Sequence, residues 1–202
     1  MEQEYKWNLT PKMNLDEMLS SELLSEKIMD HSRVEMKAIY YDTPDRLFGS
    51  MRGALRLRTE NGESVCCMKV ERSVDGACSL REEYEIAACD VYEGLSLLPA
   101  QGAPISLCRR ASQGELLELC RTEFVRVAYL LEWEENGDTC RGELAVDTGC
   151  MAREGRTAPI SEIEFEYKQG SVGLFHSFAR RMGEVFALEQ QELSKLARAM
   201  AL

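Results

Sequence analysis

The sequence of 202 residues lacks the features that mark membrane proteins and nucleic-acid-binding proteins. No apolar run approaches the ~20 residues that a membrane-spanning helix needs, so we expect no membrane-embedded segment. Positive charge is also scarce, with a formal net charge of -11 at pH 7 and a pI near 4.8. Because nucleic-acid phosphates favour a basic surface, this balance argues against a nucleic-acid partner. An anionic ligand would need a local basic site within an acidic protein.

Zinc-binding spacing and a secretory signal are absent as well. The chain has eight cysteines but no CxxC pair, so we expect no zinc site. With no signal peptide, these cysteines are expected to be free thiols in a reducing cytoplasm. His31 and His176 are interpreted as surface or helix residues and not as catalytic groups.

The hydrophobic pattern predicts one domain over residues 1–202, without repeats or linkers. Turn signals are expected at Asn61-Gly62, Asp75-Gly76 and Asn136-Gly137. Asn14 with Glu17, and Ser112 with Glu115, resemble helix capping boxes. The pattern predicts helices over 14–29, 170–188 and 192–200, a mostly helical segment over 90–121, and strands over 2–7, 34–41, 54–59, 65–72, 79–87, 123–133, 139–147 and 160–167.

Like charges recur at alternate positions of these strands. Side chains of a strand alternate between its two faces, so each such set shares one face. For a single strand, a polar face in water would explain this pattern. Like charges only ~7 Å apart repel, however, and the opposite faces are apolar enough to pack under helices. The repeated sets are Glu2/Glu4, Arg56/Arg58, Glu83/Glu85 and Glu162/Glu164/Glu166.

If helices cover the apolar faces, the charged faces turn inward around a common axis. A dry core does not hold so many charges, because each buried ion costs several kcal/mol unless it is well paired. The interior is therefore expected to be wet and to hold a ligand. Grouped bases suit a polyanion, and grouped carboxylates suit hard divalent cations. A cation that bridges carboxylates to phosphate oxygens would serve phosphoryl transfer. The inward acids are Glu2, Glu4, Glu83, Glu85, Asp147, Glu162, Glu164 and Glu166, and the inward bases are Lys6, Arg56, Arg58, Lys69, Arg81 and Arg126.

Several short motifs occur in an order that resembles one known family. Glu2, Glu4 and Lys6 meet an ExExK signature, and residues 41–45 (YDTPD) resemble its characteristic turn. The later motifs are an LRxR strand at 55–58, a lysine at Lys69, an RxExE strand at 81–85, an FxR strand at 124–126, a DxG-like segment at Asp147, an EIE strand at 162–164 and an SK pair at 194–195. Together they resemble the CYTH superfamily, the triphosphate tunnel metalloenzymes.

This resemblance implies an α+β fold, namely a closed eight-stranded antiparallel β-barrel, or tunnel, with helices packed outside. It also implies that Mg²⁺ or Mn²⁺ is held by Glu2, Glu4 and a late-strand carboxylate, Glu162 or Glu164. Glu85 or Asp147 would position a second metal and its water. Lys195 is left out of the ligand set because the SK pair continues in an unusual way. The residues that would cradle the phosphates are Lys6, Arg56, Arg58, Lys69, Arg81 and Arg126.

The resemblance predicts a cytoplasmic enzyme that hydrolyses a small anionic substrate. Inorganic triphosphate, cleaved to pyrophosphate and phosphate, is favoured because Arg126 lies in the FxR-type strand. Thiamine triphosphatase, nucleoside triphosphatase and class IV adenylate cyclase remain enzymatic alternatives. A polyphosphate-binding module without catalysis is the alternative of a different class. The oligomeric state is left open.

Overall fold

The computed structural model describes residues 2–11, 13–75 and 78–202, without the side chains of residues 2, 71–75 and 78–81. The predicted turn at Asp75-Gly76 therefore falls outside the described residues. The same holds for the predicted site side chains of Glu2 and Arg81.

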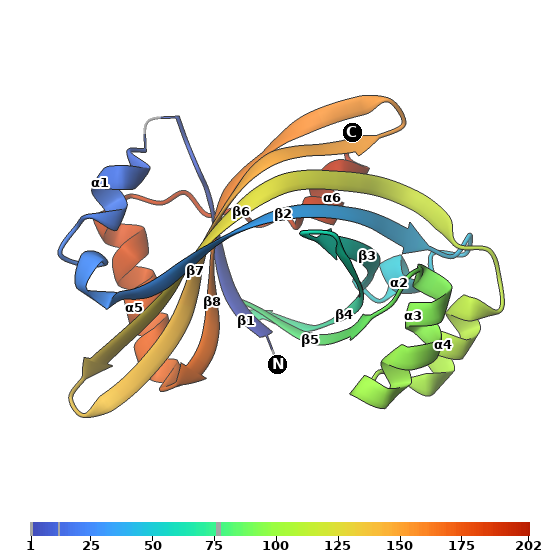
Figure 1. Cartoon of the computed structure of the whole chain (residues 1–202), viewed down its shortest axis with the longest axis horizontal. Coiled ribbons are helices and arrows are strands. Elements are labelled where there is room, and N and C mark those ends of the chain that lie inside the picture. The colour runs from blue at the N-terminus through green and yellow to red at the C-terminus, as the bar shows by residue number, and fades with distance from the viewer. Residues whose placement is uncertain (1, 12, 76–77) are drawn as a thin grey trace.

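Within the described residues, eight antiparallel strands form one curled sheet (Figure 1). The first strand pairs with β8 along residues 4–8, but with β5 only along residues 2–5. The predicted eight-stranded antiparallel sheet is thereby confirmed. The pairing order is β1 (Glu2–Asn8), β5 (Cys78–Ala87), β4 (Glu63–Asp75), β3 (Ala54–Glu60), β2 (Ile28–Asp42), β6 (Leu117–Glu135), β7 (Asp138–Arg153) and β8 (Arg156–Gly170).

Tight turns connect the hairpins where the backbone enters the left-handed region. Asn61-Gly62 joins β3 to β4 and Asn136-Gly137 joins β6 to β7, with positive φ at all four residues, so both predicted turns are confirmed. A further turn at Glu154-Gly155 has the same conformation. It lets β7 and β8 pair as far as Arg153 and Arg156. The strands predicted over 139–147 and 160–167, with a loop between them, are therefore too short, because most of that stretch extends the hairpin.

The first predicted helix is much shorter than expected. Asn14 does cap it, since its side chain accepts a hydrogen bond from the Glu17 backbone at 3.3 Å. However, α1 covers only Leu15–Leu19, followed by a 3₁₀ turn at Ser25–Lys27, and β2 already begins at Ile28. Ser20 and Ser21 donate back to the carbonyls of the preceding turn, a competing bond that favours the end of a helix.

The segment over 90–121 is helical only in its first part. It forms α3 (Val91–Leu97), a 3₁₀ turn (Leu98–Gln101) and α4 (Ile105–Ser112). Ser112 ends α4 instead of capping a further helix, and Leu117 already lies in β6, so the capping-box prediction is wrong. The predicted C-terminal helices are confirmed as α5 (Val172–Val185) and α6 (Lys195–Met200), and α2 (Leu47–Ser50) was not predicted.

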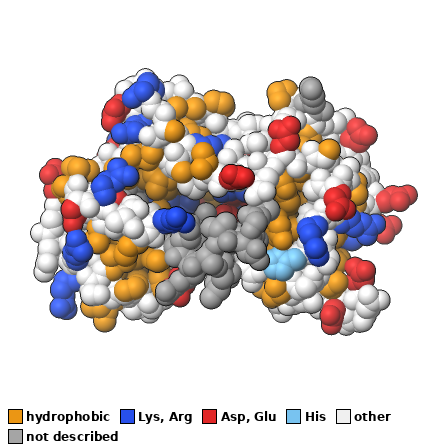
Figure 2. All heavy atoms as spheres, turned by 180° about the vertical axis from the view of Figure 1, so that it is seen from behind, with side chains coloured by type: hydrophobic (Ala, Val, Ile, Leu, Met, Phe, Trp, Pro, Cys, Tyr) orange, Lys and Arg blue, Asp and Glu red, His pale blue; other side chains and the backbone are white. Residues whose placement is uncertain are grey.

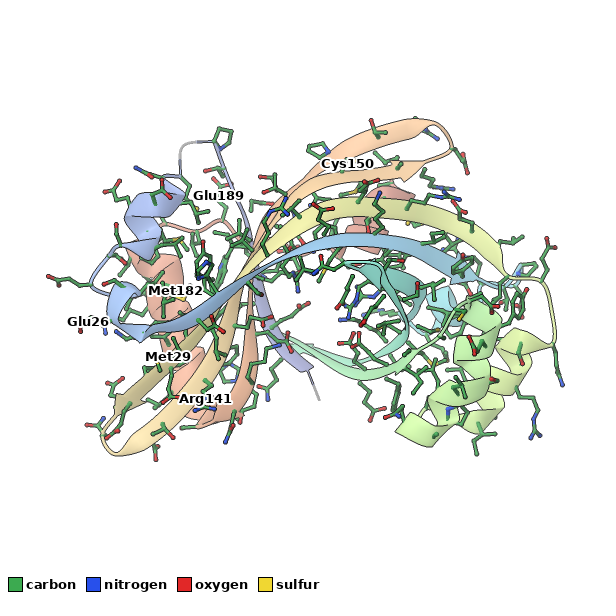
Figure 3. The ribbon with its side chains drawn as sticks, viewed as in Figure 1. Glu26, Met29, Arg141, Cys150, Met182 and Glu189 are labelled. Carbon is green, nitrogen blue, oxygen red and sulfur yellow. The ribbon has the colours of Figure 1, made fainter. Side chains whose placement is uncertain are left out.

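Most helices cover the outer, apolar face of the sheet. Trp7 and Phe165 pack against Phe175 and Met182 of α5, and Figure 3 shows Met182 on the side of α5 that meets the strands. Helices α2 to α4 cover β3–β5 in a second cluster that includes Leu55. The predicted apolar faces under helices are thus confirmed. No helix among the described residues is long and apolar enough to cross a bilayer.

Helix α6 departs from the expectation that all helices pack outside. Its Leu196 and Ala199 pack against Met36, Phe124 and Met151, whose side chains face the inside of the curl. The preceding segment, residues 189–191, runs beside the end of β1 and leads the chain to this inner position. As a result α6 lies next to the charged interior.

Candidate functional site

A cavity of about 420 Å³ lies inside the curl of the sheet. Figure 2 shows lysine and arginine side chains in the hollow at the middle of one face, beside the grey atoms that are not described. Figure 3 shows side chains of β3–β5 pointing into the space that the sheet surrounds. The charged residues that line the cavity are Glu4, Lys6, Arg52, Arg56, Arg58, Glu60, Lys69, Glu83, Glu85, Arg126, Glu143, Glu164, Glu166, Lys168 and Lys195.

One wall of the cavity is a cationic group that we name the β3–β5 cluster: Arg56, Arg58, Lys69, Glu83 and Glu85. Strand register creates it, because Lys69 pairs with Glu83 and Cys67 lies between Arg56 and Glu85 in the ladder. The Nζ atom of Lys69 lies 2.9 Å from Glu83, and Nη2 of Arg58 lies 3.0 Å from Glu85. The five side chains share one face, as the alternation predicts.

One donor atom of this cluster has no partner among the described residues. The Nε atom of Arg56 is buried and makes no hydrogen bond there, whereas the Nε atom of Arg58 contacts Glu60. A buried donor without a partner costs free energy, so such atoms are normally satisfied by protein, water or ligand. The planar guanidinium group suits phosphate oxygens, to which it donates two parallel hydrogen bonds. The β3–β5 cluster therefore fits an incoming phosphate.

The two glutamates of this cluster remain ionised. Burial alone would raise the pKa of Glu83, but Lys69 and Arg56 outweigh it and lower the pKa. Burial opposes ionisation of Glu85 too, and Arg58 is the main group that lowers its pKa. Glu85 keeps 37% of its side chain exposed, in the wall of the cavity. It can therefore accept a hydrogen bond from a molecule in that space.

Cys67 is a neutral member of the same wall. Its Sγ donates to Glu83 at 2.9 Å, and burial raises the pKa of the thiol well above its usual value. A thiol that stays protonated is a poor nucleophile and a poor metal ligand. Cys67 therefore supports the orientation of Glu83 and does not act as a reactive group.

On the opposite side of the cavity three carboxylates converge, which we name the carboxylate trio: Asp147, Glu162 and Glu164. Glu164 lines the cavity, whereas Asp147 and Glu162 are fully buried beside it. Asp147 pairs with Glu162 across β7 and β8, and one oxygen from each of the three lies within 4.8 Å of the others. Gly149 allows the close approach of β7 to β6, since a Cβ there would lie 2.2 Å from the carbonyl oxygen of Glu123. Three converging carboxylates are the hard oxygen donors that Mg²⁺ and Mn²⁺ prefer, so the trio fits a divalent metal.

Three cations from β6 and α6 contact the carboxylate trio. Arg126 donates to both oxygens of Asp147, at 2.8 and 2.7 Å, and also contacts Glu164. The Nζ atom of Lys195 lies 2.7 Å from Asp147 and 3.1 Å from Glu164, and it also contacts Glu162. Arg198 contacts Glu162 as well. These are three positive charges, two of them from α6, and Lys6 adds a fourth through Glu164.

Lys6 connects this trio to the predicted N-terminal carboxylate. Its Nζ lies 3.2 Å from Glu164 and 3.5 Å from Glu4. Burial alone would lower the pKa of Lys6, but Glu4 and Glu164 raise it. Burial also opposes ionisation of Glu164, yet Lys195, Lys6 and Arg126 hold its pKa well below the usual range. Lys6 thus bridges Glu4 and the trio.

The structure brings most predicted site residues to one cavity but divides them into two groups. Arg56, Arg58, Lys69 and Glu85 lie in the β3–β5 cluster. Lys6, Arg126, Asp147, Glu162 and Glu164 lie with the carboxylate trio, and Glu4 is close by. Glu85 and Asp147, which were assigned the same role, are on different walls.

Sequence reasoning left Lys195, the lysine of the SK pair, out of the ligand set, and it did not single out Arg198. They are three positions apart on the terminal helix and therefore share one face of it. That spacing was the available signal. It became informative only once α6 was known to lie inside the sheet.

Comparison with known proteins agrees with this geometry. Residues 1–200 match the model of the CYTH domain. A curated relative from Haemophilus influenzae, named inorganic triphosphatase, is 28% identical over 169 residues, which are 84% of this chain and 46% of that protein. The chain thus spans less than half the length of this relative.

Solved structures share the fold at low sequence identity. A Hippeastrum protein described as having a dominant triphosphatase activity is 18% identical, with a TM-score of 0.57 over 100% of this chain and 96% of that one. The protein PH1819 of Pyrococcus horikoshii is 21% identical, with a TM-score of 0.57 over 100% of this chain and 99% of that one. The match to the family model covers nearly the whole sequence, and the chain belongs to the CYTH domain family.

Proposed function

We propose that this chain hydrolyses inorganic triphosphate to pyrophosphate and phosphate in a metal-dependent reaction inside the cavity. The observation that carries the proposal is that one cavity has a wall of cations, with the unpaired Nε atom of Arg56 among the described residues, and on its other side Glu164, which converges with the buried Asp147 and Glu162. Anion and divalent cation would then meet between them. The ring of strand pairings supports a closed tunnel that separates them from bulk water.

We assign the phosphate contacts to cations on both walls. Arg56, Arg58 and Lys69 approach from the β3–β5 cluster, and Lys6 and Arg126 from the opposite side. Arg81 belongs to the predicted set, but its side chain lies outside the described residues. In phosphoryl transfer such groups act by positioning the substrate and by stabilising charge on the phosphate oxygens.

We assign the divalent cation, Mg²⁺ or Mn²⁺, to the carboxylate trio with Glu4 close by. Glu2 remains a predicted ligand on the same strand, with its side chain outside the described residues. When bound, the metal would neutralise phosphate charge and polarise the bond to be cleaved. Burial opposes ionisation of Glu164, but Lys195, Lys6 and Arg126 hold its pKa well below the usual range and keep this carboxylate ionised, whereas burial raises the pKa of Glu162.

Glu85 is our choice for orienting the attacking water. It faces the cavity with an exposed carboxylate whose lowered pKa keeps it able to accept a hydrogen bond. Asp147 is completely buried and is held by Arg126 and Lys195. We therefore assign Asp147 to the metal donors and assign orientation of the attacking water to Glu85.

The names of two related proteins support this function. The Haemophilus influenzae relative carries the name inorganic triphosphatase, and the Hippeastrum protein is described as a triphosphatase. The matched residues span 46% of the Haemophilus influenzae relative, so we state inorganic triphosphate as a proposed substrate of this chain. Localisation in the cytoplasm likewise stays a prediction.

A triphosphate with an organic substituent is a second candidate substrate. The cavity wall formed by β2 and the adjoining part of β6 includes Val34, Met36, Tyr40 and Phe124, none of which carries a charge. Such a surface suits the apolar face of a base or a thiazole ring better than it suits phosphate. Thiamine triphosphate and nucleoside triphosphates therefore belong in the substrate panel.

A phosphate-release assay on this chain tests the proposal. Inorganic triphosphate, thiamine triphosphate, ATP and long-chain polyphosphate are compared with Mg²⁺, with Mn²⁺ and with EDTA, and ATP reactions are also analysed for cyclic AMP. We expect the fastest release from inorganic triphosphate and none with EDTA. Triphosphate that binds but is not cleaved with either metal would favour the polyphosphate-binding module. Release that EDTA leaves unchanged would exclude the metal-dependent mechanism.

A further inference from the structure

The ammonium of Lys195 occupies the centre of the carboxylate trio. Its Nζ contacts an oxygen of each member, Asp147, Glu162 and Glu164. The ligand oxygens of these same three residues lie within 4.8 Å of one another. Coordination of a divalent ion requires oxygen atoms a little over 2 Å from the ion, so an ion and this ammonium would compete for one space.

The charges of the cluster lead to the same competition. The trio and Glu4 carry four negative charges, and four positive charges contact them, from Lys6, Arg126, Lys195 and Arg198. A divalent ion added to this neutral set would meet nearby cations in a buried setting, where like charges repel strongly. Departure of one ammonium relieves that repulsion.

Among these cations, the ammonium of Lys195 is positioned to move away from the carboxylate trio. Lys195 also lines the cavity, beside Leu196 of α6 and the N-cap residue Ser194, so we expect a change of its side-chain rotamer to direct Nζ toward that space. Arg126 is held differently, by two parallel bonds to Asp147 that fix its plane.

The backbone of α6 is anchored independently of these charges. Leu196 and Ala199 pack in the inner apolar cluster with Met36 and Met151. The preceding segment is pinned to β1 where the Gln191 amide donates to the carbonyl of Lys6 at 2.9 Å. The movement can therefore be confined to the Lys195 side chain.

We propose that Lys195 occupies the metal position in the metal-free protein, and that a divalent cation displaces its ammonium toward the phosphate cavity. The inference rests on the metal site of the proposed function. In the metal-free protein the ammonium keeps the carboxylates close together without mutual repulsion. After displacement it adds a positive charge beside the substrate, so that metal binding strengthens triphosphate binding, and triphosphate strengthens metal binding equally.

Binding of Mn²⁺ in the absence of triphosphate tests this exchange. Free Mn²⁺ is measured by electron paramagnetic resonance during titration of the wild type, Lys195→Met and Arg198→Met. We expect Lys195→Met to bind Mn²⁺ at least about tenfold more tightly, because no competing ammonium must be displaced. Arg198→Met is the matched control, since it removes a charge from the same helix but leaves the ammonium in place, and it should gain much less. Equal gains in both variants, or unchanged or weaker binding by Lys195→Met, would overturn the proposal.

A second measurement on the wild type does not depend on the folding of a variant. The side-chain ammonium resonance of Lys195 is followed by ¹⁵N NMR during addition of diamagnetic Mg²⁺, with assignment by Lys195→Arg. We expect this resonance to move or broaden as the site fills, and an unchanged resonance at saturating Mg²⁺ would contradict displacement. Because neither experiment contains triphosphate, the exchange can be confirmed even if the phosphate-release assay fails.

Discussion

The two walls of the cavity contain the same kinds of charged group but differ in burial. In the carboxylate trio, Asp147 and Glu162 expose none of their side chains and Glu164 exposes 11%. In the β3–β5 cluster, Glu83 exposes 19% and Glu85 exposes 37%. A deeply buried set of carboxylates holds a cation in a fixed position, whereas partly exposed groups can exchange their partners with solvent or a ligand. The walls are therefore suited to different ions.

The walls also differ in where their cations originate. Arg56, Arg58 and Lys69 come from β3 and β4, neighbouring strands whose register fixes them next to the glutamates. Two of the cations on the trio come from α6, an element more than thirty residues later in the chain than Glu162. A partner from a separate element can leave without breaking the sheet. We therefore interpret the β3–β5 cluster as a preformed site for phosphate, the phosphate wall, and the carboxylate trio as a site whose cation can be exchanged, the metal wall.

The largest effect is expected from removing a carboxylate of the metal wall. Glu164→Gln should lower kcat for triphosphate by at least about 100-fold, equivalent to about 2.7 kcal/mol, because a metal donor is lost from the reaction centre. The measurement is steady-state phosphate release over a range of Mn²⁺ concentrations. Glu118→Gln, which removes an exposed carboxylate bonded to Arg121, is the control and should retain activity. Full activity of Glu164→Gln at ordinary metal concentrations would remove the trio from the mechanism.

A substitution in the phosphate wall should change binding more than turnover. Arg58→Ala removes a phosphate contact that is present in both the ground state and the transition state, so KM should rise about tenfold while kcat changes little. Arg121→Ala, on the outer surface, provides the matched control. A fall in kcat with KM unchanged would show that Arg58 acts only in the transition state, and the division between the walls would then be wrong.

The difference between the walls also explains what sequence reasoning could and could not predict. Inward faces such as Arg56/Arg58 and Glu162/Glu164 follow from the local two-residue period of a strand. The structure places Arg56, Arg58 and Glu164 on the cavity and buries Glu162 beside it. The partners Lys195 and Arg198 depend on where the terminal helix docks, which no local pattern specifies. Similarly, the early end of α1 depends on hydrogen bonds of Ser20 and Ser21 that compete with helix continuation.

A smaller effect is expected on Tm, and it tests whether the two walls bind their ions cooperatively. If metal and phosphate share one site, a non-hydrolysable triphosphate analogue and Mg²⁺ together should raise Tm by several degrees, since a hundredfold excess over Kd adds about 2.7 kcal/mol. The triphosphate analogue alone, or a modest level of Mg²⁺ below its own Kd, should give little change, because each lacks the partner that strengthens its binding. The measurement is a thermal-shift titration of each ligand with and without the other. Merely additive shifts would mean that the two walls bind their ions separately.

The smallest effect concerns the acid stability of the phosphate wall. The pKa of Glu83 is lowered from its ordinary value of 4.5, since Lys69 and Arg56 outweigh the effect of burial. A carboxyl group with a lowered pKa in the folded state binds fewer protons than in the unfolded chain. Its stabilising contribution is therefore complete above about pH 4.5 and is lost as the pH falls through the lowered value. Glu83→Gln should then lower Tm by about 2–4 °C at pH 7, corresponding to about 1 kcal/mol, and the difference from the wild type should shrink on acidification below pH 4.5.

Glu118→Gln removes an exposed ion pair instead, and its effect should disappear in 1 M salt, where such pairs are screened. A Glu83 effect that also vanished in salt, or that grew on acidification, would show that this wall is as open to solvent as the outer surface.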